Sequence, residues 1–309
     1  MENHMDLNEF ACKVRDAVAK ELNTGLCENC KVEIKLIRKN NGVKMQGLLI
    51  SSEGECVIPT IYLESFYQAY EKGISLREIV DEIICLYREG VPKKSIDMSF
   101  YKDYDAVKDR ICYRLIRREG NEELLKDIPY IAFLDLAVCF YYAFQDDFLG
   151  EGSILIYHTH REIWNITTQQ LLDLAIDNTG RLFPEVMCSI TDVINDIRNE
   201  GETEIFEVGD EIDIQSPMTI LTNTKKSHGA ACILYPNVLE KFARKRKDSL
   251  YIIPSSIHEV ILLEKSTVSD PEDVKRMIYE VNRLHLSAEE VLSDNLYFYD
   301  FVKKTVSFV

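Results

Sequence analysis

Two runs of alternating residues flank an Asn-Gly dipeptide near the start of the chain, and they constrain its fold more than any other feature. Val32, Ile34 and Leu36 alternate with charged residues, and Asn41-Gly42 stands just before a second run that begins at Val43. Alternation with a period of two is typical of a strand with one buried face, and Asn-Gly favours the positive φ values of a type I′ turn. The segment therefore predicts an antiparallel β-hairpin.

Helix signals are interspersed with further strand patterns. Boxes of the form Ser/Thr-x-x-Glu/Gln predict helix starts after Ser75, Thr167 and Ser287, because their side chains satisfy backbone N–H groups that a first helical turn leaves unpaired. Asp270-Pro271 predicts another helix start, and Ile128–Phe144 is a strand-like apolar run. Hairpins mixed with helices predict an α+β fold of mainly antiparallel sheets with packed helices.

The length of the chain, 309 residues, exceeds one typical core and predicts two or three modules. We expect an N-terminal helix, hairpin and helices in residues 1–95, a middle α+β module in 96–200 and a C-terminal α+β module in 201–309. A single domain spanning the last two is the alternative. The three boxes recur at intervals of about 100 residues, which indicates either a divergent internal repeat or chance recurrence of a common motif.

Charge and cysteine usage limit the partners and the compartment. The net charge of −16 repels nucleic acid and anionic membrane, so neither is an expected partner. The basic cluster Arg244–Lys247 is interpreted as the end of a helix, where cations favour the helix dipole. Nine scattered cysteines and a start without a signal-peptide pattern are typical of free thiols in a reducing cytoplasm.

The first candidate for chemistry is the segment Ser255-Ser256-Ile257-His258-Glu259. In an extended chain Ser256 and His258 share a face, and a Ser–His pair is what nucleophilic catalysis needs. The alternative is a tight turn in which the two serines satisfy backbone groups and His258 packs or faces water. No Gly-x-Ser-x-Gly nucleophile motif is present.

The second candidate is a histidine pair, His158 and His160. On a strand, alternate residues share a face, so both imidazoles and the carboxylate of Glu162 would converge on one metal ion, with His258 or Asp294 as a further ligand. The alternative is a solvated strand end. Zinc is the metal that such ligands favour.

The third candidate is the Cys-x-x-Cys pair of Cys27 and Cys30. Two thiolates at this spacing bind zinc or exchange disulfides, but zinc requires further ligands and the chain has no second Cys-x-x-Cys. Incidental thiols are the alternative. No cofactor is predicted, and zinc at the histidine or cysteine pair is the single metal considered.

Several segments of the chain resemble an uncharacterised bacterial family, a domain of unknown function. The most specific are Asn178-Thr179-Gly180-Arg181-Leu182-Phe183-Pro184 and Pro254-Ser255-Ser256-Ile257-His258-Glu259, and Gly229–Tyr235 and Glu290–Asp294 add to the resemblance. The resemblance implies a bacterial, cytoplasmic protein and carries no catalytic residue. We therefore expect a non-catalytic cytoplasmic protein that binds a protein or small molecule, and the alternative is a metal-assisted or Ser/His hydrolase.

Overall fold

A computed structural model describes residues 5–23, 30–51, 58, 60–90, 101–146, 150–189 and 218–309. The chain forms two compact units. The N-terminal unit comprises Met1–Phe100 and Asp146–Gly150, and the C-terminal unit comprises Tyr101–Gln145 and Glu151–Val309. The predicted module boundaries, at residues 95/96 and 200/201, both lie outside the described residues.

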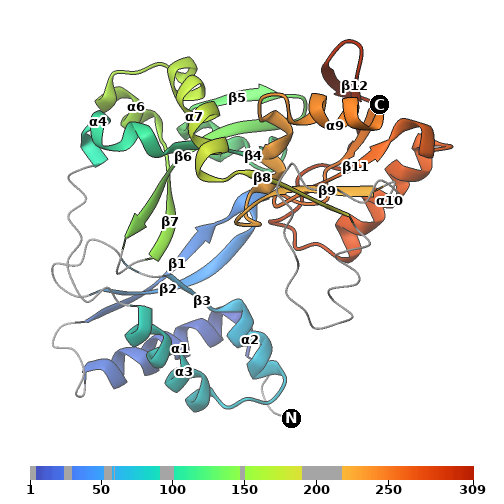
Figure 1. The fold of residues 1–309 in the computed structure, drawn as a ribbon. Helices are drawn as coiled ribbons and strands as arrows, with labels where there is room; N and C mark the ends of the chain where they lie inside the picture. Colours follow the sequence, from blue (N-terminus) through green and yellow to red (C-terminus); the bar gives the residue numbers. More distant parts are fainter. Residues whose placement is uncertain are drawn as a thin grey trace. The chain divides into compact units, whose positions relative to one another are not determined.

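The N-terminal unit packs three helices against one face of a three-stranded antiparallel sheet of order β1-β2-β3 (Figure 1). Its core joins Phe10 and Val14 to Leu48 and Ile50 and to Ile83, all at most 1% exposed. Its elements are α1 (Leu7–Asn23), β1 (Lys31–Arg38), η1 (Asn40–Gly42), β2 (Lys44–Ser51), β3 (Thr60–Tyr62), α2 (Glu64–Glu71) and α3 (Leu76–Gly90).

The predicted hairpin is confirmed. Strands β1 and β2 pair antiparallel up to Arg38 opposite Lys44. Asn41 and Gly42 have φ of 57° and 69°, the left-handed values that Asn and Gly accept most easily. The Lys39 N–H donates to the Val43 carbonyl at 2.7 Å, so the Asn-Gly pair lies inside a longer connection than a two-residue turn.

The C-terminal unit contains two antiparallel sheets with helices packed on them (Figure 1). One has the order β4-β6-β5 with β7 also on β6, and the other has the order β13-β12-β10-β11-β9-β8. The elements up to the second sheet are α4 (Tyr104–Val107), η3 (Lys108–Arg110), β4 (Ile111–Arg117), α5 (Glu122–Asp127), β5 (Tyr130–Phe133), β6 (Leu136–Asp146), β7 (Gly150–Leu155), α6 (His158–Trp164) and α7 (Thr168–Leu182). Those that follow are β8 (Glu185–Ser189), β9 (Met218–Asn223), η4 (Gly229–Leu234), α9 (Val238–Arg246), β10 (Leu250–Ile253), β11 (Val260–Glu264), η5 (Lys265–Thr267), α10 (Pro271–Leu284), β12 (Tyr297–Asp300) and β13 (Thr305–Phe308).

Pairing in the second sheet crosses the predicted 200/201 boundary. Strand β8 pairs antiparallel with β9, with Glu185 opposite Asn223. Residues on both sides of that boundary therefore belong to one sheet of one unit.

Two of the three predicted capping boxes are confirmed. Ser75 and Glu78 exchange side-chain and backbone hydrogen bonds at the start of α3, and Thr167 and Gln170 do so at the start of α7. The prediction of a helix after Ser287 is wrong. The chain there makes only a turn, because the Glu290 carbonyl accepts from the Ile257 N–H at 2.9 Å and so ties it to a distant segment.

Helix α7 covers the open edge of β4. The Tyr113 N–H donates to the Thr179 hydroxyl at 3.0 Å, and the Asn178 amide donates to the Ile111 carbonyl at 3.0 Å. An uncovered strand edge exposes unpaired backbone groups. Buried polar residues of the helix thus take the place of another strand and fix the end of α7 beside β4.

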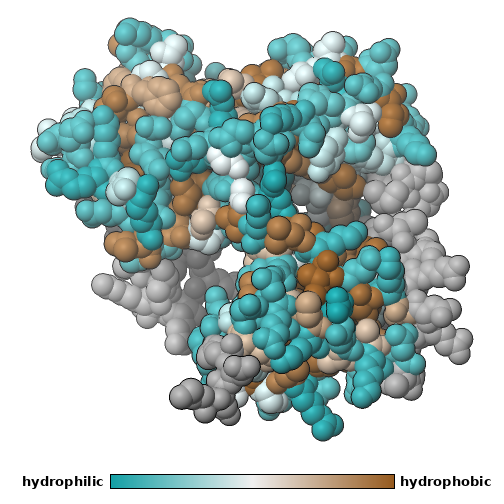
Figure 2. Space-filling model, turned by 180° about the vertical axis from the view of Figure 1, so that it is seen from behind, coloured by the Kyte–Doolittle hydropathy of each residue, from teal (hydrophilic) through white to brown (hydrophobic). Residues whose placement is uncertain are grey.

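The surface of each unit mixes residue types. On the face shown in Figure 2, hydrophobic residues lie in groups separated by hydrophilic ones. Of the described large hydrophobic side chains, Val302, Leu284 and Leu36 are the most exposed, at 88%, 74% and 63%. Among the described helices, none combines the length and the apolar character that spanning a membrane demands.

Candidate functional site

The C-terminal unit contains a cavity of about 610 Å³ beside strand β6. Its floor is apolar and buried, whereas its rim carries charged groups. Volumes of this size are typical of small-molecule sites. The residues that line it are Arg110, Tyr141, Ala143, Phe144, Gln145, Glu151, Gly152, Ser153, Leu182, Phe183, Lys225, Ser227 and His228.

The floor follows from the alternation of β4 and β6. Cys112 lies opposite Tyr141 in the sheet, and these two residues form a buried cluster with Ala143. Leu182 and Phe183, where α7 ends, pack against this cluster. Burial raises the pKa of the Tyr141 hydroxyl above its ordinary value, so the phenol stays protonated.

The wall of the cavity is the loop between β9 and η4, and Asn223 shapes it. The Asn223 carboxamide accepts from the Lys225 and Ser227 N–H groups at 3.1 and 3.3 Å and donates to the Ser227 carbonyl at 2.8 Å. Lys226 and His228 have φ of 50° and 52°. Left-handed backbone at two side-chain-bearing residues is uncommon and is characteristic of functional loops.

Gly229 fixes the far end of this loop. A Cβ at this position would lie 2.2 Å from the Thr222 hydroxyl and 2.5 Å from the His258 carbonyl oxygen. The Thr222 hydroxyl itself donates to that carbonyl at 2.8 Å. Only glycine permits this close approach of η4 to β9.

His228 is the imidazole of the cavity wall. Burial, together with the positive charge of Arg114, lowers its pKa to about 3, so the ring is neutral at physiological pH. Its backbone N–H donates to Nδ1 of His258 at 3.3 Å, and the two ring centroids lie 5.7 Å apart. Its own Nδ1 is buried and forms no hydrogen bond with any described residue.

Two cations stand at the rim of the cavity. The Arg110 guanidinium donates to the Ala143 carbonyl, and the Lys225 ammonium lies 2.7 Å from the Glu151 carboxylate. Both members of the latter pair are about half exposed, at 48% and 51%, so water screens their attraction. Glu151 is the one carboxylate among the described lining residues, whose formal charges therefore sum to a positive value.

The segment Ser255–Glu259 forms a turn in which the hypothesised Ser–His pair is not assembled. The Ser256 hydroxyl accepts from the His258 backbone N–H at 3.0 Å rather than facing its imidazole. Ser255 and Ser256 both donate to the Glu259 carboxylate, at 3.5 and 3.4 Å. Each of these groups already has a local partner in the turn.

The partners of the His258 imidazole come from elsewhere in the unit. Nδ1 accepts from the His228 N–H, so the proton of the neutral ring is on Nε2. Nε2 lies 3.8 Å from the Glu290 carboxylate, and both side chains are partly exposed. Neither His228 nor Glu290 belongs to the predicted Ser255–Glu259 group.

The strand prediction for His158 and His160 is wrong. Both residues lie in the first turn of α6, where positions two apart do not share a face. His160 accepts at Nδ1 from the Tyr157 N–H at 3.1 Å and packs against Tyr101 and Trp164. This hydrogen bond stabilises the start of α6, because it satisfies the Tyr157 N–H, which has no partner within the helix.

Only one cysteine of the predicted pair, Cys30, lies in the described part of the chain. Cys27 lies outside the described residues. Cys30 is in a disulfide, which corrects the expectation that all cysteines are free thiols. Six other cysteines are free: Cys12, Cys85, Cys112, Cys139, Cys188 and Cys232. In the described ranges, no three His, Cys, Asp or Glu side chains gather as a metal ion would require.

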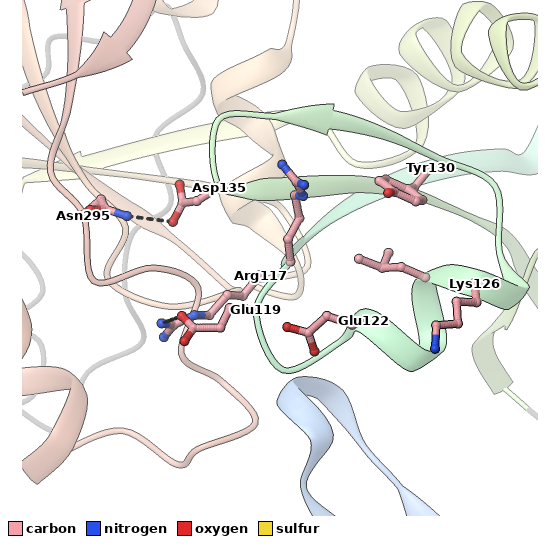
Figure 3. A pocket seen from close by; sticks show the side chains of 9 residues that line it. Arg117, Glu119, Glu122, Lys126, Tyr130, Asp135 and Asn295 are labelled. Atoms are coloured by element: carbon pink, nitrogen blue, oxygen red, sulfur yellow. Dashed lines mark hydrogen bonds and ion pairs between the residues drawn. The ribbon is translucent and has the colours of Figure 1, made fainter.

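A second cavity of about 460 Å³ lies in the C-terminal unit around Asp135 (Figure 3). Asp135 accepts hydrogen bonds from Asn295 at 3.0 Å and from Tyr297 at 2.7 Å. Arg117 pairs with Glu119 and, at 3.2 Å, with Asp294. Because these central charges are already paired within the protein, this hollow offers a ligand little that is unsatisfied.

The family comparison covers nearly the whole chain. A model for a family of unknown function, DUF5688, matches residues 7–301. The chain belongs to the DUF5688 family. This confirms the resemblance to a family of unknown function. No curated protein and no solved structure matches the chain.

One segment that carried the resemblance lines the cavity of this DUF5688 member, and another begins next to a lining residue. Asn178–Pro184 supplies Leu182 and Phe183 to the floor, and Gly229–Tyr235 starts directly after His228. The residues that the sequence reasoning missed are His228, Arg110 and Arg114. Arg114 alone had a readable signal, since it is a lone charge inside the apolar run Ile111–Ile116.

Proposed function

We propose that this protein is a non-catalytic cytoplasmic binding protein of bacteria whose C-terminal unit binds a small organic anion with an apolar or aromatic portion. The observation that carries the proposal is the cavity beside β6, which combines a buried aromatic floor with described rim residues whose net charge is positive. Cations at a concave site attract anionic ligands, and apolar walls contribute the burial that retains them.

The contrast between the cavity and the whole chain supports this choice of ligand. The chain has a net charge of −16, so its surface as a whole repels anions. The region around the cavity instead carries positive charges, from Arg110, Lys225 and the nearby Arg114. Tyr141 and Phe183 provide aromatic surface within the same cavity.

Binding without catalysis fits the lining better than hydrolysis does. The Ser256 hydroxyl is engaged with the backbone of His258, and neither residue lines the cavity. Nucleophilic catalysis requires a hydroxyl in contact with its base and open to substrate. The described lining also contains the Ser153 and Ser227 hydroxyls, but neither is hydrogen-bonded to Nδ1 of His228, and its cations and aromatic rings are positioning groups.

Titration of the full chain with small aromatic probes tests the proposal. We expect benzoate and phenyl phosphate to bind with dissociation constants of about 1 mM, as ligands of that size do, and to shift resonances of the cavity residues in NMR spectra. Benzamide, which has the same ring without the charge, should bind more weakly. The substitution Arg110→Gln should weaken binding of both anions.

The control for charge is Lys245→Gln, which removes one exposed positive charge from α9, away from the cavity lining. This variant should bind the probes as the unmodified protein does. Absence of binding by both anions, or equal binding of benzamide and benzoate, would overturn the proposed function.

A further inference from the structure

Two buried polar atoms next to the cavity have no hydrogen-bond partner. They are Nε of Arg114 and Nδ1 of His228. The two side chains are close enough for the positive charge of Arg114 to lower the pKa of His228. Buried polar groups in native proteins are nearly always hydrogen-bonded, so two unsatisfied atoms in one region of the unit indicate a missing partner.

The surroundings of Arg114 contain no anion to pair with it. Arg114 lies on β4 opposite Cys139 of β6. Its guanidinium carbon is 5.8 Å from the ring centroid of Tyr141, a residue of the cavity floor. Within the described chain, its buried Nε–H has no hydrogen-bond acceptor.

Apolar clusters flank Arg114 along the sheet face. Cys112, Tyr141 and Ala143 form one of them, and Ile116 and Cys139 belong to the other. Burial among these residues lowers the pKa of the guanidinium, which is the direction that an uncompensated buried cation takes. Arg114 keeps some exposure to solvent, but a largely buried cation without an ionic partner is unfavourable, so the site favours an anion.

We infer that Arg114 and His228 form the anion-recognising subsite of the cavity and bind one carboxylate or phosphate group between them. Nε–H of Arg114 and Nδ1–H of His228 would donate to the oxyanion, since both atoms are donors in the required states. The inference rests on the proposed function and names the residues that select its ligand. Arg110 and Lys225 then attract the ligand at the rim, and Arg114 lies beside the cavity near Tyr141 of its floor.

The substitution Arg114→Met tests the inference in the full chain. We expect the affinity for benzoate and for phenyl phosphate to fall by about 10- to 100-fold, as loss of a charge-assisted hydrogen bond does. The affinity for benzamide should not change. The midpoint of thermal unfolding of the free variant should rise, because an unpaired buried charge has been replaced by an apolar side chain of similar length.

The substitution Arg118→Met is the matched control. It removes the same charge just beyond the end of β4, from an exposed side chain that does not line this cavity. Its affinities should equal those of the unmodified protein. Comparison of benzoate with phenyl phosphate then shows which oxyanion the subsite prefers.

A second measurement is independent of whether the Met variant folds. In the unmodified protein, the arginine Nε–H resonance that disappears in Arg114→Lys should shift on addition of benzoate or phenyl phosphate and stay in place with benzamide. If the unmodified protein binds the anions but this resonance does not move and Arg114→Met keeps full affinity, the inference is overturned while the proposed function stands. If the unmodified protein binds neither anion, the proposed function fails.

Discussion

Ser293 donates its hydroxyl hydrogen to the Asp135 carboxylate at 2.6 Å, across 158 residues of sequence. Ser293 is fully buried, and its hydroxyl also accepts from the Asn295 N–H at 2.9 Å. Tyr297 and Asn295 donate to the same carboxylate. The turn between β5 and β6 is thereby tied to the segment that leads into β12, which connects the two sheets of the C-terminal unit.

The first prediction concerns this connection. Ser293→Ala should lower the free energy of unfolding of the C-terminal unit by about 1–3 kcal/mol, because it removes one hydrogen bond to the Asp135 carboxylate and leaves the Asn295 N–H without its acceptor. Urea unfolding followed by the fluorescence of Trp164, the one tryptophan of the chain, measures it. Ser266→Ala, at an exposed position of η5, should stay within about 0.5 kcal/mol of the unmodified protein. Equal stability of both variants would contradict a role for the connection.

Two glycines should respond oppositely to alanine. Gly229→Ala places a Cβ 2.7 Å from the Asn223 backbone nitrogen and closer still to Thr222 and His258, so β9 and η4 must separate. We expect a loss above about 3 kcal/mol, as for overpacking against backbone. Gly180→Ala in α7 meets only Tyr235, at 3.9 Å, and should gain about 0.5–1 kcal/mol from helix propensity. Urea unfolding followed by Trp164 fluorescence compares the two variants. An unchanged free energy of unfolding in Gly229→Ala would contradict the close approach of η4 to β9.

The third prediction tests the cover that α7 gives to β4. Thr179→Val keeps the shape of the side chain but removes the acceptor of the buried Tyr113 N–H. The variant should lose about 1–3 kcal/mol of unfolding free energy, and hydrogen exchange of the Tyr113 amide should accelerate. The exposed Thr224→Val serves as its control. Unchanged protection of the Tyr113 amide in Thr179→Val would show that another group satisfies it.

The parts of the fold that were predicted correctly are those whose determinants lie within a few residues. The Asn41-Gly42 hairpin and the boxes at Ser75 and Thr167 each carry their own hydrogen-bond partners or φ preferences in the local sequence. The box at Ser287 has the same local pattern, yet Glu290 faces His258 instead. A tertiary contact there overrides the local preference.

The turn between β5 and β6 shows why a second kind of feature was missed. The apolar run Ile128–Phe144 contains a hairpin at Leu134-Asp135, and Leu134 has φ of 53°. Leucine in the left-handed region is no turn signal. The conformation is held by the bonds of Asp135 to Ser293 and its neighbours, which come from far along the chain. No window of the sequence around Leu134 contains that information.

The candidate site was the least predictable part, because its residues come from separate elements. His258 was identified as a candidate, but its partners His228 and Glu290 are 30 and 32 positions away and belong to other segments. His228 gains its buried, neutral state only from the packing of the loop after β9 beside Arg114. Assembly of this kind follows from topology rather than from spacing.

The fourth prediction is a pH dependence of stability that arises from His228. Its pKa is about 3 in the folded protein and about 6.5 in the unfolded chain. Below pH 6.5 the unfolded chain therefore binds a proton that the folded protein does not. The stability that the neutral His228 gives the folded protein is thus complete above pH 6.5 and is lost as the pH falls toward 3. His228→Asn, which tolerates the left-handed backbone, should remove a slope of about 1.4 kcal/mol per pH unit between pH 6 and pH 4. Urea unfolding of both proteins at several pH values in this range measures the difference, with the exposed His285→Asn as control. Parallel pH profiles for His228→Asn and the unmodified protein would mean that His228 is protonated in the fold, and its place as a neutral donor beside Arg114 would have to be abandoned.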